Sequence, residues 1–189
     1  MLNTISKRLT GHLVNAGVIS SDLEDIYIYG FEILITSLLS TVLIIIAGLA
    51  SGRISDTVIF LIVFIGLRSF TGGFHANTYR LCTFLTLSVY GLVMLLSKYV
   101  IVPDAAYRML LPIGIIILLM KAPVRNQNKN LTDKEAARHK IVSIVLFSVM
   151  MLAGALLFQK SASINGTVFY TLIADLVLIF IKTRYVTSD

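Results

Sequence analysis

One polar stretch of the chain combines residue types that are suited to acyl-transfer chemistry. The stretch RSFTGGFHANTYRLC, residues 68–82, contains His75 and the only cysteine of the chain, Cys82, together with Gly72 and Gly73. A cysteine nucleophile needs a base that forms the thiolate and a backbone that lets a peptide carbonyl come close. The stretch therefore holds a candidate nucleophile, a candidate base and a flexible backbone.

The spacing between His75 and Cys82 limits how the chain can fold around them. Seven residues on one continuous helix place two side chains about 10.5 Å apart along its axis, whereas an imidazole meets a thiol at about 3 Å. A catalytic dyad therefore requires a break between the two residues, and the glycine pair favours an interrupted or re-entrant entry to the next span. A homodimer that pairs the two residues across subunits is an alternative that the sequence leaves open.

Other chemistries have weaker support. A lone cysteine at the start of an apolar segment is most often a small buried side chain. The histidines His12, His75 and His139 lack the spacing of zinc ligands, so no metal is expected. No phosphate-binding loop and no G-x-S-x-G elbow occurs, so no nucleotide or other cofactor is expected.

The composition indicates which elements must position these residues. Of the 189 residues, 57% are hydrophobic and 14% are charged, and the mean hydropathy is +0.88. A soluble domain is roughly half apolar, so residues 1–189 are expected to form one all-α domain, a polytopic membrane helical bundle. The net charge of +6 is assigned to orientation of the spans in membrane lipid, with no nucleic acid as partner.

Six membrane spans are expected from apolar windows of about 20 residues. Four are clear, and two are weaker because one is short and the other contains Pro112. In chain order the six are residues 31–50, 56–67, 82–102, 105–122, 141–158 and 168–182.

The basic residues predict the orientation of these spans. With the N-terminus inside, twelve lysines and arginines fall on the cytoplasmic side and four outside, as the positive-inside rule requires. Both termini, the stretch 68–81 and a basic loop over 121–140 are then cytoplasmic. That loop either orients the spans or attracts an acidic precursor tail or the anionic inner leaflet.

The N-terminal segment, residues 1–26, begins with an amphipathic helical pattern. It is expected to lie in the membrane interface or to pack on the cytoplasmic end of the bundle. Both interpretations bury the same apolar face, which consists of Leu2, Ile5, Leu9, Leu13 and Ala16.

At this point the residues resemble a known family. The run RSFTGGFHA, followed seven residues after its histidine by Cys82, in a basic six-span chain of this length, resembles the accessory gene regulator B (AgrB) family of membrane cysteine endopeptidases. The resemblance implies an enzyme that processes the pro-peptide of a quorum-sensing signal, an AgrD-like substrate, in Gram-positive bacteria. It implies that Cys82 and His75 are catalytic and that Arg68 and Gly73 are important.

The resemblance also implies a mechanism. Cys82 forms a thioester with the precursor, His75 acts as general base and then general acid, and the tail departs. A cysteine of the precursor then attacks the thioester and closes a thiolactone ring, or a serine closes a lactone. With the orientation that the basic residues predict, the reaction takes place in the cell membrane at its cytoplasmic side. The exchange of one thioester for another requires no ATP.

Supporting roles are more open. Backbone N–H groups near Gly72 and Gly73 stabilise an oxyanion, or the glycines serve a turn that needs positive φ. Arg68 binds a precursor carboxylate or favours the thiolate, or it is only a topology signal. Asn77 orients His75 or caps the following turn.

Two acidic residues lie inside predicted spans, where an ionised group is costly. Glu32, near the cytoplasmic end of the first span, is a candidate to orient His75 or to bind substrate. Asp175, near the middle of the sixth, is expected to pair with a polar group or to stay protonated, and neither acid is expected to be catalytic. The same intramembrane acids are compatible with a small transporter or channel, and a non-catalytic scaffold is a further alternative. Only the protease hypothesis requires a reactive Cys82 thiol.

Overall fold

The computed structural model describes residues 2–72, 79–124, 132–156 and 161–180. Apart from a short 3₁₀ turn at Ser21–Leu23, the secondary structure described is α-helical. The helices are α1 Leu2–Asn15, α2 Glu24–Ala50, α3 Ile54–Thr71, α4 Tyr79–Tyr99, α5 Asp104–Lys121, α6 Asp133–Leu156 and α7 Ala162–Phe180. The expected all-α, polytopic membrane architecture is confirmed.

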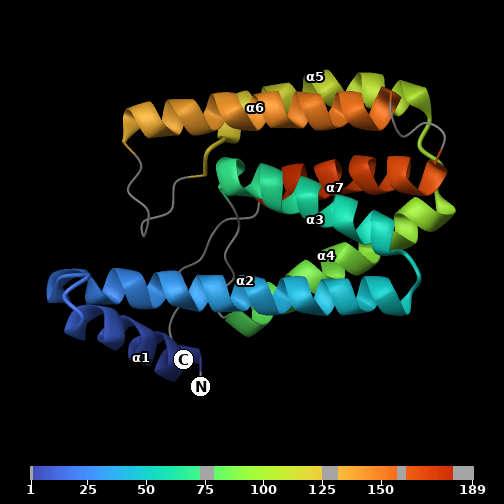
Figure 1. Cartoon of the computed structure of the whole chain (residues 1–189). Coiled ribbons are helices and arrows are strands. Elements are labelled where there is room, and N and C mark those ends of the chain that lie inside the picture. The colour runs from blue at the N-terminus through green and yellow to red at the C-terminus, as the bar shows by residue number, and fades with distance from the viewer. Residues whose placement is uncertain (1, 73–78, 125–131, 157–160, 181–189) are drawn as a thin grey trace.

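Helices α2 to α7 lie in layers and alternate in direction along the chain (Figure 1). Helices α5 and α6 form one layer, α3 and α7 the next, and α2 lies on the far side with α1 beside its N-terminal half. Helix α7 is the central element, because it packs against α3, α4, α5 and α6. As a result, one end of the bundle gathers the C-terminal ends of α3, α5 and α7 with the N-terminal ends of α2 and α6 (Figure 1).

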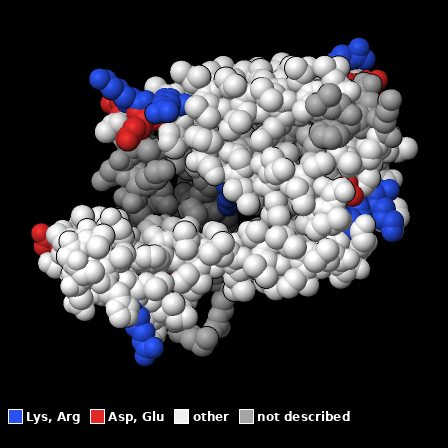
Figure 2. All heavy atoms as spheres, viewed as in Figure 1, with Lys and Arg blue, Asp and Glu red and all other residues white. Residues whose placement is uncertain are grey.

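Two apolar clusters fill the bundle. The first lies between α3, α5, α6 and α7 and includes Leu67, Leu118, Phe147 and Leu172. The second joins α2, α3 and α4 and includes Ile44, Phe60, Tyr90 and Val93. Many other large apolar side chains of the long helices face outward, and charged groups gather toward the ends of the helices (Figure 2). An apolar belt between charged ends is the surface that a bilayer requires.

Five of the described helices are long and apolar enough to cross a membrane: Ser21–Ala50, Ile54–Thr71, Leu81–Tyr99, Asp133–Leu156 and Ala162–Phe180. The sequence predicts a sixth span at 105–122. A helix is present there, α5, but its 18 residues include Asp104, Arg108 and Lys121. The whole length of α5 therefore contains three charged residues, one more than the equally long α3. Helix α5 nevertheless packs along α6.

The buried face of α1 differs from the expectation. The face turned toward α2 buries the polar side chains Ser6 and Thr10, while Ile5 and Leu9 are about two-fifths exposed, at 43% and 41%. The hypothesis that the apolar face packs on the bundle is therefore wrong. An apolar face directed away from the protein is the arrangement of a helix that lies in the membrane interface.

The basic segment 121–140 is a loop only in part. Lys121 is the last residue of α5, and residues from Asp133 onward form the first two turns of α6. Thr132 and Glu135 cap the N-terminus of this helix with two reciprocal hydrogen bonds. The Thr132 N–H donates to Glu135 Oε2 at 2.9 Å, and the Glu135 N–H donates to Thr132 Oγ1 at 3.4 Å. This capping box is readable in the sequence as T-x-x-E, and hydropathy alone misses it.

A polar network closes the end of the bundle opposite to α1. Arg53, between α2 and α3, donates to Asp56 Oδ2 at 3.1 Å and to Ser97 Oγ of α4 and Ser163 Oγ of α7 at 2.9 and 2.6 Å. Asp56 in turn accepts from Ser163 and Thr167 of α7. The network joins α3, α4 and α7 at one end, so these helices can diverge only toward the other.

Candidate active site

A small pocket lies between α3, α4 and α7. Its lining combines Arg68 and Phe64 of α3 with Cys82 and Thr86 of α4 and Leu178 of α7, and Leu85 and Val89 complete it. Arg68 belongs to the last turn of α3, and Cys82 is the fourth residue of α4 as described. Two residues that the sequence singles out therefore share one pocket, between helices that meet near their ends.

Cys82 is half-buried and carries the one thiol of the chain. Its first-turn position places it near the positive end of the α4 dipole, which stabilises negative charge. Its backbone carbonyl accepts a hydrogen bond from Thr86 Oγ1 at 2.9 Å, and Thr86 also lines the pocket. This position suits a thiolate nucleophile at the mouth of a largely apolar pocket.

Arg68 supplies the positive charge of the pocket. Its guanidinium lies over the ring of Phe64, 5.1 Å from the centroid, and it lines the same pocket as Cys82. A guanidinium fixed in this way can stabilise an anion that forms on the thiol or on a bound peptide.

Gly72 ends α3 in a conformation that only glycine adopts readily. Its φ is 72° and its ψ is 151°, a region nearly restricted to glycine, and a Cβ atom there would lie 2.6 Å from the carbonyl oxygen of Val124. The Val124 N–H donates to the carbonyl of Thr71 at 2.8 Å. The expectation of a positive-φ turn is confirmed at Gly72, and the turn is in contact with the segment that follows α5.

His75, Gly73 and Asn77 lie outside the described residues, so the geometry of the dyad stays a prediction. Helix α3 ends at Thr71, before His75, and the described part of α4 begins at Tyr79, before Cys82. His75 therefore does not belong to α3.

Glu32 is engaged by α1. It is buried, at 4% exposed, and its Oε1 accepts a hydrogen bond from Asn3 Nδ2 at 2.9 Å. Two turns further along α2, Ser40 Oγ lies 3.3 Å from Thr83 Oγ1, next to Cys82. Eight residues of helix span about 12 Å, so Glu32 is displaced from Cys82 by that distance along α2.

Asp175 is closer to the pocket than the sequence suggests. Because α7 starts at Ala162, earlier than the predicted 168, Asp175 lies five residues before the end of the helix at Phe180 and not at its middle. Leu178, one turn further on, lines the pocket. The early start of α7 escapes a hydropathy reading because its first turn contains Ser163 and Asn165.

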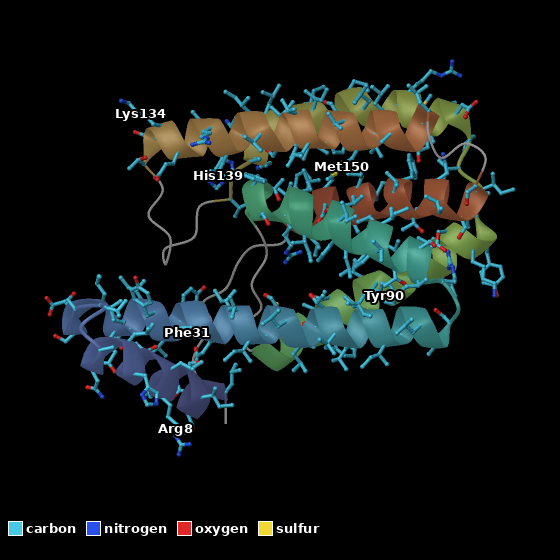
Figure 3. All side chains as sticks on the ribbon, viewed as in Figure 1. Arg8, Phe31, Tyr90, Lys134, His139 and Met150 are labelled. Carbon is cyan, nitrogen blue, oxygen red and sulfur yellow. The ribbon has the colours of Figure 1, made fainter. Side chains whose placement is uncertain are left out.

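A further contact occurs at this end of the bundle. His139, in the second turn of α6, packs its ring against Phe70 of α3 with the centroids 5.5 Å apart (Figure 3). Within the described ranges, no three His, Cys, Asp or Glu side chains gather as a metal site requires. The functional groups that the structure does bring together are the Cys82 thiol and the Arg68 guanidinium.

Comparisons with known proteins agree with the resemblance. The family model described as "Accessory gene regulator B" matches residues 6–181. A "Putative AgrB-like protein 2" of Clostridium perfringens (strain 13 / Type A) is 26% identical over 159 residues, which are 80% of this chain and 74% of the relative. A "Putative AgrB-like protein" of Clostridium perfringens (strain SM101 / Type A) is 25% identical with the same coverage. No solved structure shows a significant match.

Proposed function

The chain belongs to the accessory gene regulator B family, and from this premise we propose that it is a membrane cysteine endopeptidase with Cys82 as its nucleophile. Its substrate is a small AgrD-like pro-peptide. The enzyme cleaves this pro-peptide and promotes its cyclisation to an autoinducing peptide for quorum sensing. The observation that carries the proposal is the pocket in which the one thiol of the chain lies with Arg68.

The first half of the reaction forms an acyl-enzyme. His75 removes the thiol proton, and the Cys82 thiolate attacks a peptide carbonyl of the precursor. As the tetrahedral intermediate collapses, His75 gives its proton to the leaving amine, the C–N bond breaks, and a thioester to Cys82 remains. Arg68 supplies positive charge near the developing oxyanion.

The second half releases the product without an external energy source. A thiol of the precursor attacks the thioester carbonyl, its proton passes through His75 to Cys82, and a thiolactone closes. One thioester bond is broken and one is made, so the exchange is nearly balanced in free energy. A serine hydroxyl closes a lactone in the same way. Water competes for the acyl-enzyme, and the apolar lining from Phe64, Leu85, Val89 and Leu178 limits its access.

The pocket is assigned to the cytoplasmic side of the cell membrane. The basic residues divide twelve to four in favour of this orientation, and both termini lie on the same side in that arrangement. The basic segment after α5 then faces the side on which a newly made precursor is available. Its cations suit an acidic precursor tail or anionic lipid.

Co-expression with the pro-peptide encoded by the neighbouring small open reading frame tests the proposal. The unsubstituted chain is expected to yield a C-terminal fragment and a cyclic peptide whose masses sum to that of the precursor. Cys82→Ala and His75→Ala are each expected to abolish both products and to leave membrane insertion unchanged, because the two residues act in one covalent step.

The same experiment separates the protease from a transporter or a scaffold. Neither alternative depends on a thiol, so neither explains products that disappear with Cys82. Substantial cleavage by either variant contradicts the dyad. Cys82→Ser is a matched variant that keeps the volume of the side chain, and it is expected to insert normally and to cleave far more slowly.

A further inference from the structure

One face of α6 exposes a continuous apolar stripe. The helix packs against α3, α5 and α7, and on its remaining face large apolar side chains recur every three or four residues, the spacing of a single helix face. Each is between 54% and 64% exposed, and together they are Ile141, Val145, Val149, Leu152 and Leu156. Helix α6 is long and apolar enough to cross a membrane, so lipid acyl chains cover this stripe.

Two cations continue the stripe toward the start of α6. Arg138 precedes Ile141 by three residues and Lys134 precedes Arg138 by four, so both lie on the same face of the helix. Both side chains are exposed. Lys134 points away from the bundle, whereas His139 lies on the side of α6 that faces α3 (Figure 3). The cations therefore face the same surroundings as the apolar stripe.

No carboxylate of the described residues forms an ion pair with Lys134 or Arg138. The acidic neighbours Asp133 and Glu135 lie about 100° to either side of Lys134 around the helix. Glu135 Oε2 already accepts hydrogen bonds from the N–H and the hydroxyl of Thr132. The positive charge on this face of α6 is therefore available to an anion from outside the chain.

The length of α6 places the two cations at the level of the lipid headgroups. At 1.5 Å per residue, the helix axis runs about 27 Å from Leu156 to Arg138 and about 33 Å from Leu156 to Lys134. The hydrocarbon core of a bilayer is about 30 Å thick. With Leu156 at one border of this core, Arg138 and Lys134 fall on either side of the other border. Their long side chains extend from there to the phosphates, because a charge left in hydrocarbon is costly.

We propose that Lys134 and Arg138 bind the phosphate of an anionic phospholipid whose acyl chains lie along the apolar stripe of α6. What covers the cations is continuous with what covers the stripe, and a lipid satisfies both parts with one molecule. Two cations without a carboxylate partner favour a headgroup with net negative charge over a zwitterionic one. The site does not depend on the proposed function, since it requires no reaction at Cys82.

The first test measures lipid binding without any precursor. The full-length chain is purified in a neutral detergent, and Tm is followed as dioleoylphosphatidylglycerol or dioleoylphosphatidylcholine is added. Phosphatidylglycerol is expected to raise Tm more. Lys134→Gln and Arg138→Gln are each expected to raise the mole fraction of phosphatidylglycerol that gives half of this shift about fivefold, and the double variant about 25-fold, which corresponds to about 1 kcal/mol for each cation near an anionic surface. Equal shifts by the two lipids in the unsubstituted chain overturn the proposal.

Lys140→Gln is the matched control. It removes the same charge from the same helix, but Lys140 lies about 160° around the axis from Arg138 and is only half-exposed. The variant is expected to change the half-point for phosphatidylglycerol by less than about twofold, because electrostatic attraction to a lipid on the stripe falls with distance. An effect equal to that of Arg138→Gln would reduce the site to overall charge and overturn it. Lys134→Arg, which keeps the charge, is expected to bind as the unsubstituted chain does.

An acidic segment of the precursor is the other occupant that two cations suit, and a second test separates it from the lipid. The unsubstituted chain and the double variant are reconstituted in vesicles of phosphatidylcholine alone, and cleavage of the precursor is measured. An equal kcat/KM is expected, because no anionic lipid is present to be lost. A lower kcat/KM in the double variant overturns the lipid assignment in favour of a peptide. If neither chain cleaves the precursor, the proposed function fails, while the lipid titration still decides the site on α6.

Discussion

At the scale of single residues, the main feature of the site is the Arg68 cation in the same pocket as the Cys82 thiol. Cys82 and Arg68 come from a recognisable stretch, so their proximity could be predicted from sequence, and the structure confirms that they share a pocket. Leu178 could not be connected with them, because it lies 110 positions after Arg68 in the sequence and reaches the pocket only through the packing of α7 on α3 and α4.

Gly72→Ala tests the turn that ends α3. A non-glycine residue in this conformation costs about 1–3 kcal/mol, and the added Cβ atom would collide with the backbone of Val124. The variant is expected to unfold at a lower temperature and to cleave the precursor more slowly, because the exit of α3 toward His75 shifts. Thermal unfolding and kcat/KM are measured on the same preparation.

Gly91→Ala provides the control for this substitution. Gly91 lies within α4, and a Cβ atom there would meet nothing within 4 Å, so alanine is expected to be neutral or stabilising by up to about 1 kcal/mol. If Gly72→Ala behaves like Gly91→Ala in both measurements, the turn has no special role.

The element scale shows where hydrophobic pattern predicts structure and where it does not. Apolar windows predict the middles of the spans, but α6 and α7 begin earlier than expected because their first turns are polar. For α1 the pattern leaves two interpretations open, and the burial of its polar face against α2 excludes packing of the apolar face on the bundle and favours the membrane interface. The acyl chains of the lipid are as apolar as a protein core. Ile5 and Leu9 can therefore face outward, while Ser6 and Thr10 pack on α2.

Arg53→Ala tests the network that joins α3, α4 and α7. The substitution removes the cation paired with the part-buried Asp56, and the loss of hydrogen bonds to a charged group is expected to lower the free energy of unfolding by about 2 kcal/mol. Thermal unfolding in detergent measures the effect. Cleavage of the precursor well below Tm is expected to be unchanged, because the pocket lies at the other end of these helices.

Lys98→Ala is the corresponding control, since Lys98 is an exposed cation near the same end that packs over Tyr99. It is expected to change stability by less than about 0.5 kcal/mol. Equal effects of the two substitutions would mean that the Arg53 network contributes no more than a surface contact.

At the scale of the whole molecule, the alternating helices place one end of the bundle, with the pocket, opposite the end closed by Arg53 (Figure 1). The order and direction of the helices follow from hydropathy and short connections. Which end faces the cytoplasm rests on the distribution of basic residues alone. The packing that forms the pocket, with Leu178 of α7 beside Cys82 of α4, depends on long-range contacts that no local pattern contains.

Cysteine accessibility tests the orientation. In a Cys82→Ser background, a cysteine introduced at Asn128 is expected to resist a membrane-impermeant thiol reagent in intact cells and to react once the membrane is opened. A cysteine at Ser51, between α2 and α3, is expected to react in intact cells. Labelling of the Asn128 position from outside would reverse the orientation.

The central claim is that Cys82 forms a thioester with the N-terminal part of the precursor, and trapping this intermediate tests the claim most directly. In a precursor whose internal cysteine or serine nucleophile is replaced by alanine, the acyl group loses its fast exit. Intact-mass measurement at early and late times is expected to show the chain plus the N-terminal fragment, released by hydroxylamine and absent from Cys82→Ala. Cleavage of the altered precursor at the normal rate with no adduct at any time, and only linear product from the intact precursor, would contradict the thioester-exchange mechanism and leave ordinary hydrolysis in its place.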